Sequence, residues 1–237
     1  MLRGLRCDRA AGPCVLHVER GAATGRPRAR TPEDRGPPAE DRYPAVFLGR
    51  DDATRGHWIG AYGTRGYVLF SHGISPNNET VVHLPAGGPV ADVRVHRDRI
   101  DAPSPLRFFN WAADEVGDAA LDAPDGAGEP SLGAVGTSNP IACKQDVVVD
   151  VILAPGDHSN VSLSLYMADV GGRHRQQVVE VFDFDRVGTR VSPSRLVENF
   201  EHGVYDRWRY GRSVRFKLAY VRAVEGADAI VSALFFD

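Results

Sequence analysis

The feature that most constrains the fold is a succession of short apolar runs, rich in β-branched and aromatic residues, that begins at Ala45. Gly, Pro, Asn or Asp bounds each run, as is typical of strands joined by turns. In one run, Val161, Leu163 and Leu165 alternate with polar residues, which indicates an antiparallel strand with one buried face. No long segment keeps the 3.6-residue apolar period of a helix.

We therefore predict an all-β fold, an antiparallel two-sheet sandwich of the jelly-roll type with about a dozen strands. The strands are expected at 45–49, 66–71, 80–84, 90–96, 106–111, 147–153, 161–168, 177–185, 196–200, 204–210, 213–219 and 229–236. Gly and Pro residues are frequent at 114–139 and aromatic residues are absent there, so we expect a long, mobile loop on the rim of the sandwich.

The first 42 residues differ in composition from the rest. They hold nine Arg against six acids, and no aromatic residue occurs before Tyr43, whereas residues 43–237 carry a net charge of −6 and all 20 aromatic residues. A Pro-rich segment without aromatics buries too little apolar surface to offset its ordering entropy. We predict a disordered or loosely docked tail or linker at 1–42 and a single β-sandwich domain at 43–237. Charged residues interrupt any apolar run in the tail, so no secretory signal peptide is expected there.

Charge and hydropathy argue against two classes of partner. The net charge is −3, and 26 of the 28 basic residues are Arg, which points to codon bias more than to phosphate contacts, so we expect no nucleic-acid partner. No run of about 18 apolar residues occurs, so we expect no membrane span. The three cysteines, Cys7, Cys14 and Cys143, predict neither a disulfide framework nor a zinc site, and Cys143 is expected to be a small buried residue.

One segment, 51–67, is unusually dense in glycine, aromatic and acidic residues. It resembles the start of a β-sandwich module found in bacterial secreted glycoside hydrolases and other extracellular proteins. The residues that carry this resemblance are Asp52, Thr54, Gly56, Trp58, Gly60, Tyr62, Gly63, Gly66 and Tyr67. The likeness continues through Leu165, Tyr166, Asp169, Gly172, Arg173, Gln176, Val179, Val181, Asp183, Val197, Asn199, Phe200, Gly203, Tyr205 and Trp208, and ends in the closing strand 229–236.

The resemblance covers residues 46–237 and implies a galactose-binding-like or malectin-like jelly roll. Modules of this kind are extracellular accessory domains, non-catalytic and presumed to bind carbohydrate. The chain departs from the pattern after Trp111. An expected Arg is missing from the segment 118–121, and an aromatic strand is reduced to residues 133–136. This departure implies that any specificity set by the loop near Trp111 has changed or been lost.

Five residues are candidate ligand contacts. Trp111, which precedes the long loop, is the best candidate for an exposed ring, and Trp208 shares one strand face with Asp206 and Tyr210. Most Trp and Tyr in a sandwich belong to the core, so each of these rings has a structural alternative. Arg173 is a ligand candidate as well, although an ion pair with Asp169 that stabilises the fold is the stronger expectation.

A structural Ca²⁺ is a further hypothesis. Sandwiches of the resembled class often bind calcium near the first strand, and Asp51 and Asp52 can supply carboxylate ligands there. The alternative is that Asp52 and Thr54 cap the turn through hydrogen bonds to the backbone.

Three classes of function remain at this stage. A carbohydrate-binding accessory module requires an exposed aromatic platform with polar groups around it. A structural or protein-interaction subunit of a larger assembly requires apolar surface, with the N-terminal tail docked on a partner. An enzyme is the least expected of the three, because it needs two carboxylates about 5–9.5 Å apart in a cleft, and the adjacent pairs Asp51–Asp52 and Asp114–Glu115 do not provide them.

Overall fold

A computed structural model describes residues 45–72, 80–97, 106–137, 146–156, 161–221 and 229–237. These residues belong to one compact unit, Ala39–Asp237. The predicted tail at 1–42 and Cys143 lie outside the described residues. In the part of the chain that is described, no helix is long and apolar enough to cross a membrane.

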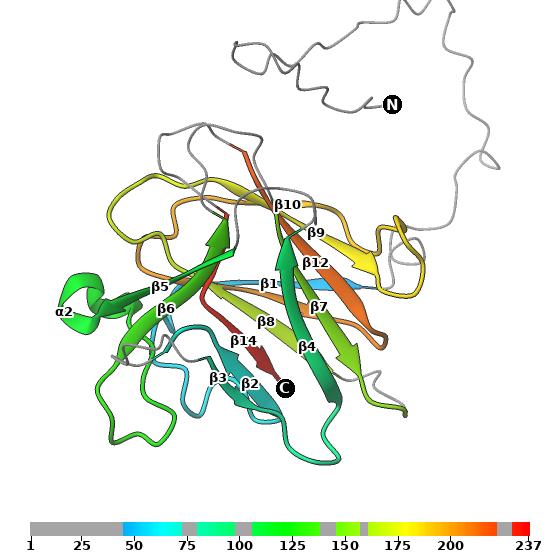
Figure 1. Cartoon of the computed structure of the whole chain (residues 1–237), viewed down its shortest axis with the longest axis horizontal. Helices are drawn as coiled ribbons and strands as arrows, with labels where there is room; N and C mark the ends of the chain where they lie inside the picture. Colours follow the sequence, from blue (N-terminus) through cyan, green and yellow to red (C-terminus); the bar gives the residue numbers. More distant parts are fainter. Residues whose placement is uncertain (1–44, 73–79, 98–105, 138–145, 157–160, 222–228) are drawn as a thin grey trace, which may run out of the picture. The chain divides into compact units, whose positions relative to one another are not determined.

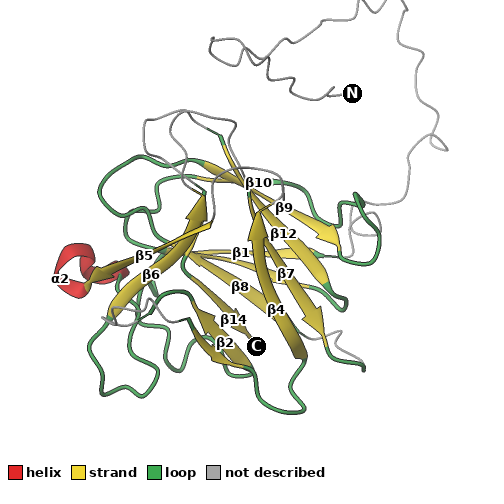
Figure 2. Ribbon diagram, in the orientation of Figure 1, coloured by secondary structure: helices red, strands yellow, loops and turns green. Residues whose placement is uncertain are grey.

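The described residues are nearly all β, and every strand pair is antiparallel, which confirms the all-β, antiparallel part of the prediction (Figures 1 and 2). The strands form three sheets where two were predicted. The six-stranded sheet contains β1 (Val46–Asp51), β11 (Val204–Arg209), β8 (Ser162–Met167), β14 (Ala233–Phe236), β2 (Gly66–Leu69) and β3 (Val81–His83), in that order. The five-stranded sheet contains β10 (Arg195–Val197), β9 (Gln177–Asp183), β12 (Val214–Tyr220), β7 (Val147–Leu153) and β4 (Val90–Arg97). A three-stranded sheet contains β13 (Ile230–Val231), β6 (Ser131–Thr137) and β5 (Leu106–Ala112).

The two large sheets pack face to face around the main core. Alternate residues of β8, such as Leu163 and Leu165, and of β12, such as Phe216, point into this core and are fully buried. The period-two alternation of the sequence therefore places the apolar side chains as predicted. The six-stranded and five-stranded sheets thus form a sandwich within the described residues.

The six-stranded sheet is also buried on its other face. Tyr166, Tyr205 and Phe235 point away from the main core into a second apolar cluster, which is closed by Trp58 and Tyr62. The Tyr62 and Tyr205 rings stack, with their centroids 4.2 Å apart. Burial on both faces explains why β14 carries aromatic residues at two adjacent positions, with Phe236 in the main core and Phe235 in the second cluster.

The segment 51–67 therefore covers the second cluster. It is fastened to the segment after β5, since Gly56 N donates to the Asp118 carbonyl over 2.9 Å and Trp58 Nε1 donates to the Asp122 carbonyl over 2.9 Å. A Cβ on Gly56 would lie 1.7 Å from the Ala120 carbonyl oxygen, so only glycine allows this approach.

The predicted loop at 114–139 is wrong over about half of its length. The short helix α2 (Ala113–Val116), the 3₁₀ turn η2 (Gly117–Ala119) and the strand β6 occupy much of it, and residues 120–130 form the loop among the residues described there. Residues 131–136 of β6 are buried, and atoms of other segments closely approach both of its glycines. A Cβ on Gly133 would lie 1.8 Å from the Phe70 carbonyl oxygen. The small residues that resembled a loop are those that a tightly packed strand needs.

The predicted strand at 229–236 divides between two sheets. Ile230 and Val231 pair with β6, whereas the residues after Ser232 pair with β2 and β8. Ser232 is fully buried at the transition, where its carbonyl accepts a hydrogen bond of 3.0 Å from Phe70 N. One continuous apolar run thus holds the three-stranded sheet to the six-stranded sheet.

Candidate ligand-binding face

The outer face of the five-stranded sheet carries two cross-strand rows of polar side chains. Strand register places Arg94, Asp150, Arg215 and Phe182 side by side across β4, β7, β12 and β9. The next row contains His96, Val148, Lys217 and Glu180. Directly opposed side chains on one face interact, so these rows behave as units.

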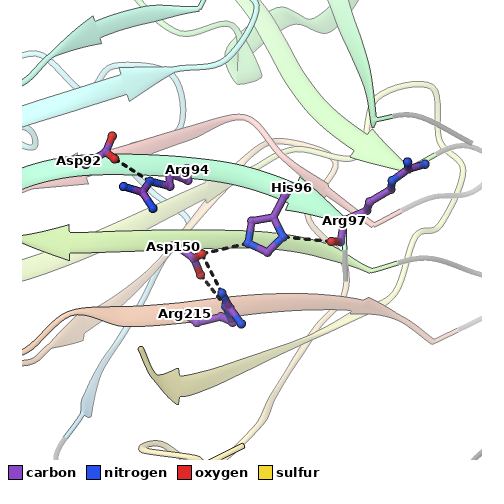
Figure 3. A network of polar contacts seen from close by, with 6 residues as sticks. All are labelled: Asp92, Arg94, His96, Arg97, Asp150 and Arg215. Atoms are coloured by element: carbon purple, nitrogen blue, oxygen red, sulfur yellow. Dashed lines mark hydrogen bonds and ion pairs between the residues drawn. The ribbon is translucent and has the colours of Figure 1, made fainter. Parts of the chain in front are cut away.

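Asp150 lies at the centre of the first row (Figure 3). Its carboxylate accepts hydrogen bonds from Arg215 Nε over 2.6 Å and from Arg215 Nη2 over 2.9 Å, and it also contacts His96 Nε2 at 2.9 Å. His96 Nδ1 lies 3.0 Å from the Arg97 carbonyl oxygen. Both partners of the His96 ring are acceptors, so both contacts are hydrogen bonds only when the ring carries two protons.

The surroundings hold Asp150 in its charged form. Burial alone would raise the pKa of the Asp150 carboxyl, but the hydrogen bonds from Arg215 and His96 outweigh burial and keep this pKa below its usual value. The bond to Asp150 in turn raises the pKa of Arg215. A carboxyl with a lowered pKa is unsuited to act as a general acid, which needs the opposite shift.

A depression of about 380 Å³ opens on this face. The turn that follows β9 forms one rim, where Val187 is 91% exposed. Phe182 and Phe184 supply ring surface, and Arg215 and Lys217 supply charge. The Arg215 guanidinium carbon lies 5.9 Å from the centroid of Phe184. Aromatic rings and planar charged groups thus share one hollow.

Cations and carboxylates lie at different depths around the depression. The Arg215 side chain is 37% exposed, whereas that of its partner Asp150 is 5% exposed. Lys217 contacts Asp146 at 2.7 Å, and again the cation is the more exposed partner, at 29% against 18%. A molecule in the depression therefore meets Arg215 and Lys217 before their partner carboxylates, Asp150 and Asp146.

A second hollow of about 320 Å³ lies between the edge strands β3 and β4. Its lining is mostly apolar, and two of its side chains, Val82 and Phe108, are 58% and 44% exposed. It contains few groups that could orient a polar ligand.

Three of the sequence-predicted ligand contacts are core residues. Trp208 is fully buried between the two large sheets, where its ring lies 5.3 Å from both Phe47 and Phe216, centroid to centroid. Tyr210 is buried beside it, and Asp206 is buried in an ion pair with Arg50 at 2.8 Å. These three residues share one strand face, as predicted, but that face points into the core. None of them presents a surface to a ligand.

Trp111 is half-buried rather than exposed. It stacks on Phe109 with centroids 5.6 Å apart and also packs against both apolar clusters. Trp111 lies on the three-stranded sheet, whereas the polar rows lie on the five-stranded sheet, so the structure does not bring them into one site. Trp111 therefore packs between the main core and the second apolar cluster.

The predicted ion pair of Asp169 forms with a different arginine. Asp169 is buried with Arg175, whose backbone N–H donates to the carboxylate over 2.8 Å and whose guanidinium also contacts it. Arg173 is exposed. The glycines at 171 and 172 turn the chain so that the second Arg, and not the first, points inward.

The candidate calcium ligands differ from one another in their surroundings. Asp51 accepts hydrogen bonds from the backbone N–H groups of Ala53 and Thr54 and from the hydroxyls of Thr54 and Tyr62, all between 2.6 and 3.0 Å. The cap predicted for Asp52 is thus made by Asp51, and Asp52 is exposed. Across the described ranges, no group of three His, Cys, Asp or Glu side chains could hold a metal ion.

The residues of the outer face were not among the sequence-predicted contacts. A signal was available, because Asp150 is the one charged residue in the run Val147–Leu153. A charge within an otherwise apolar strand is buried only when partners surround it. The partners Arg215 and His96 are remote in sequence, however, so the sequence alone does not identify them.

Comparison with known proteins adds little to the geometry. No protein-family model matches the chain, and no curated protein matches it. Among solved structures, the enzymatically active domain of tailspike protein 4 from bacteriophage CBA120 is similar over 61% of this chain and 19% of that chain, with 7% identity and a TM-score of 0.33. The chain thus spans about a fifth of that structure, and a likeness of this strength carries no argument about fold or function.

Proposed function

We propose that the protein is a non-catalytic carbohydrate-binding module of galactose-binding-like jelly-roll type, acting outside the cell as an accessory domain. The observation that carries this proposal is the depression on the five-stranded sheet, where Phe182 and Phe184 adjoin Arg215 and Lys217. Sugar rings offer apolar faces that pack on aromatic side chains and hydroxyls that bond to charged planar groups. The resemblance noted in the sequence supports the same function.

The ion pairs of the acidic residues and the lowered pKa of Asp150 support a non-catalytic role. On the outer face, Asp150 is paired with Arg215, Asp146 with Lys217, and Glu180 with Arg190. Glycoside hydrolysis requires one carboxyl that stays protonated near neutral pH, whereas Asp150 has a lowered pKa. Binding without bond cleavage fits these groups better.

A glycan array tests the function. The full chain should bind at least one glycan, and Phe184→Ala should weaken that binding about five- to tenfold, the loss expected for one stacking ring. Phe108→Ala is the matched control, because Phe108 is an exposed ring on the three-stranded sheet. If Phe184→Ala and Phe108→Ala lose binding equally, the site does not lie in the depression beside Phe184. An intact chain that binds no glycan would reject the function.

The second candidate is a protein-interaction subunit of a larger assembly. The exposed Val82 and Phe108 beside the apolar hollow favour it, since apolar side chains at sheet edges are typical of protein contacts. The same array decides between the two functions, because this candidate predicts no glycan binding at all.

A further inference from the structure

We infer that the ligand of the outer face is an anionic saccharide, one whose sugars carry carboxylate or sulfate groups. This inference rests on the proposed carbohydrate-binding function and specifies the class of ligand. It follows from the depths of the charges around the depression, from the hydrogen-bond donors that remain on Arg215, and from the ring surface beside them.

The charges that a ligand can reach in the depression are positive. Asp150 and Asp146 lie beneath their cationic partners, and Arg215 and Lys217 are the more exposed members of the two pairs. Asp183, the carboxylate that lines the depression, accepts hydrogen bonds from the backbone N–H groups of Asp185 and Arg186 over 2.9 and 3.0 Å. The accessible charge is therefore positive, although the pairs are formally balanced, and an anion can approach without displacing a carboxylate from its donors.

Arg215 is held in a fixed orientation. Its Nε and Nη2 atoms both bond Asp150, which fixes the plane of the guanidinium. A guanidinium has five N–H groups, so about three remain on the edge that faces away from Asp150. That edge matches the two oxygens of a carboxylate or of a sulfate. Asp150 thus serves as a positioning residue for Arg215.

The apolar surface beside Arg215 favours a saccharide over other anions. Phe184 lies against Arg215, and Val187 projects from the rim, so apolar surface adjoins the positive group. A sugar acid presents an apolar ring face and an anionic group about one ring apart, which fits this arrangement. An acidic peptide carries the same charge without the rigid ring face.

Calorimetric titration of the full chain tests the class of ligand. The probes are a galacturonic acid oligosaccharide, a sulfated galactan oligosaccharide, a neutral galactan oligosaccharide of the same length, and a poly-glutamate peptide. At least one acidic sugar should bind about tenfold or more tightly than the neutral one, and the difference should shrink as salt is raised to about 0.5 M. The two acidic arms show whether carboxylate or sulfate is preferred.

Substitutions at Val187 test the site without endangering the fold, because this side chain is almost wholly exposed. Val187→Lys should tighten binding of the acidic probe and Val187→Asp should weaken it, each by about two- to fivefold, the usual range of one exposed charge pair. Val187→Asn is the neutral control and should leave affinity unchanged. Arg215→Gln should lower affinity further, while Arg94→Gln, in the same row but not lining the depression, should not.

The outcomes separate this inference from the proposed function. Equal affinity for neutral and acidic sugars would overturn the anionic class and leave carbohydrate binding in place. Poly-glutamate binding as tight as that of the acidic sugars would overturn it too, in favour of an acidic protein partner. No binding of any saccharide would reject both. If the charge introduced at residue 187 does not change the affinity for the acidic sugar, the binding site is not the depression on the five-stranded sheet.

Discussion

At the scale of single residues, the hydroxyls of two buried tyrosines differ in their partners. Tyr166 Oη donates to the Ala119 carbonyl over 2.8 Å and so links β8 to the segment after α2. Tyr210 Oη has no hydrogen-bond partner among the described residues, although the side chain is buried and burial raises its pKa. A buried hydroxyl without a hydrogen-bond partner destabilises a fold, whereas one with a partner stabilises it.

The two tyrosines should therefore respond to the same substitution with opposite signs. Tyr166→Phe should lower the free energy of unfolding by about 1–2 kcal/mol, because the Ala119 carbonyl loses its donor. Tyr210→Phe should leave that free energy unchanged or raise it by up to about 1 kcal/mol. Urea denaturation of both variants measures the difference, and a large loss of stability in Tyr210→Phe would show that its hydroxyl has a partner.

At the scale of elements, sequence reasoning succeeded where a strand has one buried face. Val214, Phe216 and Leu218 of β12 alternate with polar or less buried residues, and the pleat of a strand converts that alternation directly into one buried face. The alternation of Leu163 and Leu165 also predicted one buried face, but β8 is buried on both faces. The prediction failed at β6, because atoms of other segments lie where the Cβ atoms of residues 133 and 136 would be. The sequence of the strand does not reveal these contacts. Local propensity counts glycine against a strand, but close approach of another backbone can require it.

Gly133 should accordingly tolerate no side chain. Gly133→Ala should cost about 3 kcal/mol or more, because the added Cβ would overlap the Phe70 carbonyl and force β6 away from β2. Gly171→Ala is the control, with open space around its Cβ position, and should cost only about 1 kcal/mol for its positive φ. Thermal unfolding compares the two, and equal losses would mean that the contact at Phe70 is unimportant.

At the scale of the whole molecule, depressed carboxyl pKa values link stability to pH. Partial burial alone would raise the pKa of Asp51, but the hydrogen bonds from Thr54, Tyr62 and Ala53 together outweigh it and lower this pKa to about 2 from 3.8. Asp150, on the other large sheet, is shifted in the same direction. A carboxyl whose pKa is lower in the folded state stabilises that state above its unfolded pKa, and the stabilisation is lost as pH falls through the folded value.

The contribution of Asp51 and Asp150 to stability should therefore be constant near neutral pH and fall as the pH drops from about 4 to about 2. Asp51→Asn should cost about 1–2 kcal/mol at pH 7 and much less at pH 2, where the wild-type carboxyl is partly protonated. The exposed Asp52 provides the control, since Asp52→Asn should have little effect at either pH. Chemical denaturation across this pH range provides the measurement, and a pH-independent cost for Asp51→Asn would contradict the shift.

The same measurement examines the calcium hypothesis. The oxygens of Asp51 already accept four hydrogen bonds, so a cation would have to displace donors. Adding Ca²⁺ should therefore leave the unfolding midpoint unchanged. A midpoint that rises with calcium concentration, and that loses this rise in Asp52→Asn, would revive the metal site.

The sequence by itself determined the class of fold and most of the strands, because a period of two is a local property that a strand turns into a buried face. The sequence did not determine which face of the molecule a ligand would contact. The glycine-rich and aromatic segment 51–67 is the most distinctive part of the sequence, yet Trp58 and Tyr62 close the second cluster. Trp208 lies in the core because both sides of its sheet are covered. Only the tertiary structure brought His96, Asp150 and Arg215 together from three strands, because antiparallel register, not proximity in the chain, decides which side chains are neighbours.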